Sequence, residues 1–318
     1  MMLTHFKLTK YLAIASFFAV ILAYIVIGLG AYTRLSNAGL GCPDWPGCYG
    51  HFEAPVNQHA RKARIEMVHR YVAGTLGIFI FAIALLSALI AIQRGFQFLM
   101  IALTLFVLII YQVFLGMWTV TLKLLPIIVT QHLLGGMCLL SLLWLIHLRC
   151  RQSNFAITPT ESEKKLRIPA LIVLSAVFVQ IFLGAWTSTN YAAIVCPGFP
   201  FCHAAQPMHY AFQSAFNFLT PLGINNAARM TIQMTHRFGA LVIFLCIVFL
   251  FFKTRYIAVL KKIMHIALII VILQIALGVF NVLFHRPLLI SLLHNLFGAT
   301  LLLTLVTLNH FLYNKTAV

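Results

Sequence analysis

Residues 65–70 read IEMVHR and set one carboxylate and one imidazole at the point where a long apolar helix is expected to leave water. Ionisable side chains in a membrane segment are costly, so they indicate function by default. A near copy at residues 232–237 reads IQMTHR. The copy keeps Ile, Met, His and Arg but has Gln233 in place of Glu66. We interpret the shared His-Arg pair as a cofactor-binding element and Glu66 as the mark of the half in which chemistry takes place.

The composition around these motifs is that of a polytopic membrane protein. The chain has 318 residues, of which 62% are hydrophobic and 8% charged, and apolar runs of about 20 residues recur along it. The formal net charge is +17. Most of this charge lies in short loops, where positive residues set topology. We therefore exclude nucleic acid as a partner and expect membrane lipid around the chain.

Eight apolar segments are predicted to be transmembrane helices. They cover residues 11–31, 66–92, 97–118, 130–148, 169–190, 230–252, 257–280 and 289–311. The Lys and Arg residues between them gather on the side of both termini, which predicts a multi-pass protein with cytoplasmic N- and C-termini.

The chain repeats itself in order. GAYT at 30–33 matches GAWT at 184–187, and CPDWPGC at 42–48 matches CPGFPFC at 196–202. Because each copy contains an even number of helices, both copies face the same way. The predicted fold class is an all-α membrane protein with two tandem, parallel four-helix bundles related by a pseudo-two-fold axis along the membrane normal. The predicted domains are residues 1–148 and 169–318, joined by a cytoplasmic linker at 149–168.

Each half carries two histidines near the outer ends of its helices: His69 and His132 in the first, His236 and His294 in the second. Two facing histidines at matched depth can bind one haem iron axially, and helical bundles commonly build cofactor sites in this way. A single membrane histidine is more often an interhelical hydrogen-bonding residue. Four at equivalent positions favour haem iron ligation, with one haem site per half toward the outer face.

Haem propionates also need partners. Arg70 and Arg237 directly follow the first histidine of each pair, and Arg34 leads into the first cysteine loop. An Arg guanidinium matches a carboxylate bidentately. These three arginines are therefore candidate propionate contacts, although interfacial snorkelling explains them equally well.

Four cysteines form two close pairs in outer segments, where oxidising conditions allow disulfides: Cys42-Cys48 and Cys196-Cys202. A four-cysteine zinc site is a weaker alternative because each spacing is longer than usual for zinc. Each pair is either a structural staple or redox-active. For the first pair we favour a redox role, because its short loop lies above the presumed reaction site.

The run TRLSNAGLGCPDWPGC at 33–48, the EMVHR motif at 66–70 and the three further helix histidines resemble the bacterial haem A synthase family. The resemblance covers nearly the whole chain and departs locally at residues 37–38, away from the histidines. It implies an oxidoreductase of the bacterial inner membrane that converts a ring methyl of haem O to a formyl group by successive hydroxylation, which supplies haem A to terminal oxidases. It further implies that His236 and His294 bind a resident haem b, while His69 and His132 bind the iron of the substrate haem O.

Glu66 is the candidate catalytic residue because only the first half has a titratable group three residues before its histidine. It can accept a proton or stabilise positive charge at the oxidised carbon; alternatively it only pairs with Arg70 or Arg64. If His69 and His132 both bind the substrate iron, no axial position stays open for dioxygen. Water is then the expected oxygen donor, and labelled water that leaves no label in a trapped hydroxymethyl intermediate would contradict this hypothesis.

Two other classes are compatible with four aligned histidines: a two-haem transmembrane b-type cytochrome and a haem carrier or assembly chaperone. Neither requires an acid in one half only. Expected partners are the membrane enzyme that produces haem O and an unidentified electron acceptor. The sequence leaves open whether the chain forms a homo-oligomer.

Overall fold

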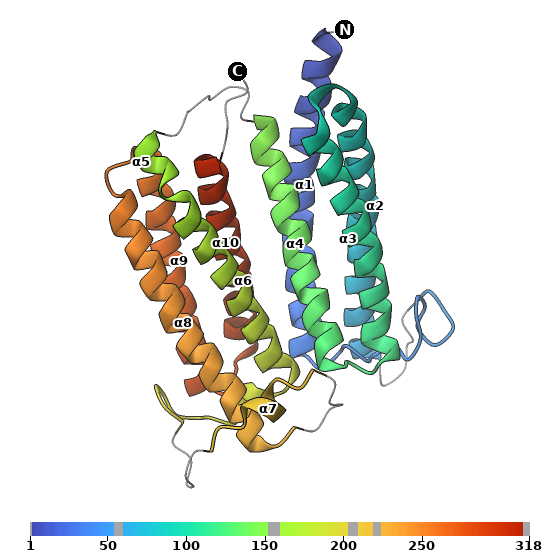
Figure 1. Ribbon diagram of the computed structural model, residues 1–318. Helices are drawn as coiled ribbons and strands as arrows, with labels where there is room; N and C mark the ends of the chain where they lie inside the picture. The colour runs from blue at the N-terminus through green and yellow to red at the C-terminus, as the bar shows by residue number, and fades with distance from the viewer. Residues whose placement is uncertain (1, 54–59, 152–159, 203–208, 219–223, 314–318) are drawn as a thin grey trace. The chain divides into compact units, whose positions relative to one another are not determined.

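The computed structural model describes residues 2–53, 60–151, 160–202, 209–218 and 224–313. Within these ranges all regular structure is helical apart from one isolated bridge between Cys48 and His51. Eight of the described helices are long and apolar enough to cross a membrane. They are α1 (Met2–Leu35), α2 (Ala60–Arg94), α3 (Phe96–Thr121), α4 (Pro126–Arg151), α6 (Arg167–Thr189), α8 (Asn226–Thr254), α9 (Ala258–Leu283) and α10 (Leu288–Tyr313) (Figure 1). The predicted all-α membrane fold with eight spans is thereby confirmed, whereas the symmetry between the halves stays a prediction.

The first two helices extend beyond their predicted apolar cores. Helix α1 begins at Met2 and α2 at Ala60, whereas hydropathy places their starts at residues 11 and 66. Arg and Lys are good helix formers, so the basic residues before Glu66 extend the helix toward its N-terminus. His69 therefore lies between two and three turns inside α2 and does not open it.

Local backbone signals end and restart the helices. Gly95 adopts φ +89° between α2 and α3, a conformation that glycine reaches without steric cost. Lys123 and Leu124 are left-handed just before Pro126, the first residue of α4. Asn225 caps α8, where its side chain accepts a hydrogen bond from the Ala228 N–H at 2.9 Å.

The chain divides into two compact units. The first contains α1, α2, α3 and the part of α4 from Gly135 onward. In it α2 packs against both α1 and α3 (Figure 1). Toward the opposite end from His69, Nδ1 of His147 on α4 lies 2.9 Å from the Ala13 carbonyl oxygen on α1. These contacts make α2, which carries both Glu66 and His69, the central helix of the unit.

The second unit comprises Leu122–Leu134 and Glu161–Leu312. Here α8 is central and packs against α6 and α9, while the Asn309 side chain of α10 donates to the Ala170 carbonyl of α6 at 3.1 Å. The first residues of α4 thus group with the second unit. The predicted boundaries at 148 and 169 stay predictions; of the predicted linker, residues 152–159 lie outside the described part, and the rest includes α5 (Glu161–Lys164).

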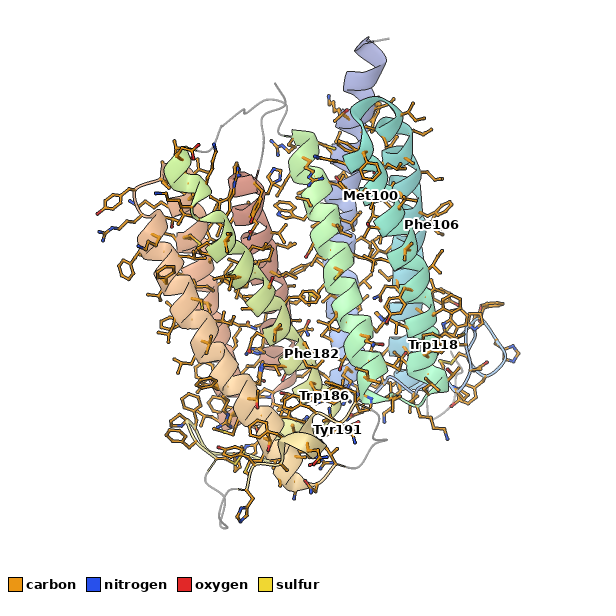
Figure 2. The ribbon with its side chains drawn as sticks, in the orientation of Figure 1. Met100, Phe106, Trp118, Phe182, Trp186 and Tyr191 are labelled. Atoms are coloured by element: carbon orange, nitrogen blue, oxygen red, sulfur yellow. A yellow bond between two sulfur atoms is a disulfide. The ribbon has the colours of Figure 1, made fainter. Side chains whose placement is uncertain are left out.

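A buried tryptophan fixes the end of the second unit at which α6 ends and α8 begins. Trp186 of α6 is 3% exposed and donates from Nε1 to the Ala215 carbonyl oxygen in the short helix α7 (Phe212–Ala215) at 2.9 Å. Its ring stacks on Phe182, with centroids 6.0 Å apart (Figure 2). The buried residue Ile232 of α8 belongs to the same cluster. This packing holds α7 beside the first turns of α8, the helix that carries His236.

Candidate functional site

In the second unit, two imidazoles face each other across the bundle. His236 lies on α8 and His294 on α10, and their ring centroids are 6.4 Å apart with planes at 84°. Metal–nitrogen bonds of about 2 Å on both sides of one iron separate two imidazole centroids by roughly 6 Å. The pair therefore has the spacing that a haem iron with two axial histidines requires.

Hydrogen bonds fix the orientation of both rings. Nδ1 of His294 lies 3.0 Å from the main-chain carbonyl oxygen of Gln274, and the Gln274 side chain donates back to the His294 carbonyl at 2.8 Å. Because a carbonyl oxygen only accepts, Nδ1 carries the proton and Nε2 keeps the lone pair that binds a metal. The side-chain nitrogen Nε2 of Gln180 lies 3.0 Å from Nδ1 of His236 and donates to the His236 main-chain carbonyl at 2.8 Å.

Glycines on neighbouring helices make room for these rings. A Cβ atom built on Gly184 would lie 3.1 Å from Cε1 of His236, and one built on Gly278 would lie 3.2 Å from Cε1 of His294. Contacts this short require the ring to move. The same arrangement holds in the first unit, where a Cβ atom on Gly30 would lie 3.1 Å from Cε1 of His69.

The first pair of histidines is divided between the two units. His69 belongs to the first unit, and His132, near the N-terminal end of α4, belongs to the second. Nδ1 of His69 is buried and has no hydrogen-bond partner among the described residues. His132 lies six residues after the start of α4, as His294 does in α10. The matched depth within these two helices agrees with the predicted repeat.

Glu66 is buried, with 4% of its surface exposed, and both of its carboxylate oxygens are bonded. Oε1 forms an ion pair with the Arg70 guanidinium at 2.5 Å, one turn along α2. Oε2 accepts the Cys42 main-chain N–H at 2.9 Å. The sequence also allows Glu66 to serve only as a partner of Arg70, and this ion pair is present. The catalytic role of Glu66 remains a proposal.

Both predicted disulfides are present. Cys42 is bonded to Cys48 and Cys196 to Cys202, each with Cα atoms 4.8 Å apart. All four cysteines are buried. The disulfides close two short loops that pack on the first turns of α2 and α8. The first disulfide packs against Met67 of α2 and the second against Met230 of α8.

The arginines after the first histidines contact these loops. The Arg70 guanidinium donates to the carbonyl oxygens of Asp44 at 2.9 Å and Gly47 at 2.6 Å, and Arg237 donates to the corresponding loop of the second half. Donors used in this way are not available to a propionate. Arg237 retains a buried Nε without a hydrogen-bond partner among the described residues, and Arg34 lies in the last turn of α1.

Asp44 organises the residues that follow the first disulfide. Its carboxylate accepts the N–H groups of Gly50 at 2.7 Å and Tyr49 at 2.6 Å. The Gly50 N–H is the largest cause that holds the pKa of Asp44 below its ordinary value. Bonds from N–H groups favour the charged carboxylate, so Asp44 stays ionised at neutral pH. The loop therefore carries a fixed negative charge at Asp44.

A glycine allows the first loop to lie directly on α2. A Cβ atom on Gly41 would lie 2.5 Å from the carbonyl carbon of Lys62 and 2.7 Å from the Ala63 nitrogen. Main-chain atoms of a helix cannot move aside, so Gly41→Ala is expected to lift the loop and destabilise the protein by about 1–3 kcal/mol. Thermal unfolding of the purified protein measures this change. Gly74→Ala is the matched control because no described heavy atom lies within 4 Å of its added Cβ; equal unfolding temperatures for both variants would contradict the prediction.

Comparison with known proteins identifies a family and relatives that match most of the chain. The model of the COX15-CtaA family, described as cytochrome oxidase assembly protein, matches residues 13–306. A protein of Shewanella oneidensis named Heme A synthase is 41% identical over 315 residues, which cover 92% of this chain and 94% of the relative. Proteins of the same name from Wolbachia pipientis and Bacillus cereus are 27% and 26% identical, and each match covers 92% of this chain. The chain belongs to the COX15-CtaA family of cytochrome oxidase assembly proteins.

Proposed function

We propose that this chain is a membrane-bound haem A synthase, an oxidoreductase that converts a ring methyl of haem O to the formyl group of haem A. The relatives that bear this name cover nearly the whole chain. The observation that carries the proposal is the facing pair His236 and His294, whose 6.4 Å centroid spacing fits a haem iron. The same His-Arg motif recurs in the first half with an acid beside it.

We assign the resident haem b to the second half. His236 and His294 would hold its iron, Gly184 and Gly278 would keep the two rings in place, and Arg237 would contact a propionate through its remaining Nε donor. Such a haem supplies one-electron transfer when bound. Gln180 on α6 and Gln274 on α9 would fix the two imidazoles by hydrogen bonds. This matters because a loosely held ligand would weaken the iron site.

We assign the substrate site to the first half, with His69 and His132 on the iron of haem O and Arg34 near its propionates, whereas the guanidinium of Arg70 is taken up by the loop carbonyls and Glu66. Conversion of a methyl to a formyl group removes four electrons and four protons when water supplies the oxygen. Glu66 is the acid of the repeated motif in this half, and we give it the role of accepting a proton from the reacting carbon or oxygen or of stabilising positive charge there. The electrons leave to an acceptor outside the chain.

Pigment extraction tests the proposal. The protein is co-expressed with an enzyme that makes haem O, and the haems are extracted and separated by mass. We expect a formyl porphyrin that is absent when the chain is omitted. Haem O recovered unchanged together with two permanently bound haems b would identify a cytochrome, and haem O bound reversibly without change would identify a carrier; either result would refute the synthase.

A further inference from the structure

The two disulfide loops are held by the same arginine contact. In the second half, Nη1 of Arg237 donates to the carbonyl oxygens of Gly198 at 2.7 Å and Pro200 at 3.0 Å, and Nη2 donates to that of Cys196 at 2.8 Å. In the first half, Nη1 of Arg70 makes the equivalent contacts to Asp44 and Pro46. The planar guanidinium suits this role because its donors have a fixed geometry.

The halves differ in one arm of the arginine. Nη2 of Arg237 binds the first cysteine of its loop, whereas Nη2 of Arg70 turns to Glu66 at 2.5 Å. The residue at the position of Glu66 in the second half is Gln233, which accepts the Cys196 N–H at 3.2 Å and donates to the Ala193 carbonyl at 3.0 Å. The loop anchor is therefore common to both halves, and the ion pair is added in the first.

From this difference we propose that Arg70 and the Cys42-Cys48 loop are positioning elements that hold the carboxylate of Glu66 in one orientation. The disulfide contributes to this positioning because it closes the loop. The main-chain N–H of Cys42, the first residue of that loop, donates to the Glu66 carboxylate. This inference rests on the function proposed above, in which Glu66 acts on the substrate.

Two observations support fixed positioning. Both carboxylate oxygens have partners that come from different directions, one from α2 and one from the loop. The side chains of Arg70 and Glu66 are 13% and 5% exposed, so water competes little for these bonds. Hydrogen bonds between charged groups are about twice as strong as neutral ones. A carboxylate held in this way is oriented before the substrate arrives, which is what an acid–base group needs.

The rate of disulfide reduction measures how firmly each arginine holds its loop. Purified protein is exposed to a phosphine reductant, free thiols are alkylated at intervals, and mass spectrometry reads the two cysteine pairs in the same molecules. A lysine side chain keeps the positive charge but lacks the several donors of the planar guanidinium. Arg70→Lys is therefore expected to speed reduction of Cys42-Cys48 about tenfold, while the reduction rate of Cys196-Cys202 should be unchanged. Arg237→Lys should do the reverse. An unchanged rate at Cys42-Cys48 in Arg70→Lys, or equal acceleration of both pairs, would overturn the proposal.

Turnover separates positioning from simple stability. Arg70→Lys should lower kcat for haem O conversion in the otherwise native protein, but it should not lower the residual kcat further in a Glu66→Gln background, because the group it positions is gone. Arg70→Lys should speed reduction of Cys42-Cys48 both in the otherwise native protein and in the Glu66→Gln background. Independent, multiplicative losses in kcat would refute the positioning role. A native protein that forms no formyl porphyrin would refute the proposed function instead, while the reduction rates still decide whether Arg70 anchors the loop.

Discussion

Replacing His236 with alanine is expected to remove the haem b that we assign to the second half. The iron would lose one of its two axial ligands, and the nearby Gln180 amide cannot take its place because an amide is a poor ligand for iron. Loss of a supporting group alone typically costs 10- to 100-fold in metal affinity, so loss of the ligand should cost more than about 100-fold. The ratio of haem to protein after purification, read from the visible absorption spectrum, measures the effect. His294→Ala should behave in the same way.

A matched histidine controls for the substitution itself. His265 on α9 is exposed, and its Nδ1 lies 2.7 Å from the main-chain carbonyl oxygen of Lys261 in the same helix. His265→Ala should therefore leave haem content unchanged. Gln180→Ala should give an intermediate loss, because it frees the His236 ring without removing it. Native haem content in both His236→Ala and His294→Ala would contradict the assignment of this pair.

The sequence predicts those parts of the site that repeat as side-chain patterns. The eight spans follow from apolar runs, and the His236 and His294 pair follows from its copy at His69 and His132. The cysteine pairs are close in sequence, so local geometry alone allows their disulfides. Each of these features depends on residue type and spacing, which a sequence displays directly.

The supports of the site could not be predicted because their partners are main-chain atoms or empty space. The sequence suggests Arg70 and Arg237 as propionate contacts, but most of their observed acceptors are loop carbonyl oxygens, which every residue type carries. Gly184 and Gly278 matter because a Cβ would meet an imidazole. The one usable signal for the supporting glutamines is the repeat itself, since Gln274 begins the segment QIALG at 274–278, which matches QVFLG at 112–116.

Glu66→Gln is expected to slow formation of the formyl porphyrin strongly while the protein still folds and binds haem. Gln233 shows that an amide at this position still accepts a cysteine N–H from the loop, so the first loop should remain on α2. What disappears is the group that can ionise. General acid–base groups contribute about 10²- to 10⁴-fold to a rate, so kcat should fall by that range. Extracted haems separated by mass give the yield of haem A relative to haem O.

The control for this substitution removes an acid elsewhere in the chain. Glu161 in α5 is largely exposed and pairs with Lys164 at 2.5 Å, and Glu161→Gln should leave haem A yield at the native level. The disulfide state and haem content of Glu66→Gln should also match the native protein, because its fold is retained. If Glu66→Gln makes haem A at the native rate, the carboxylate has no role in the reaction, and the ion pair with Arg70 serves only to hold the loop. The difference between Glu66 and Gln233 would then be a difference between two ways of anchoring a loop. It would not mark the first half as the reaction site and the second as the site of the resident cofactor.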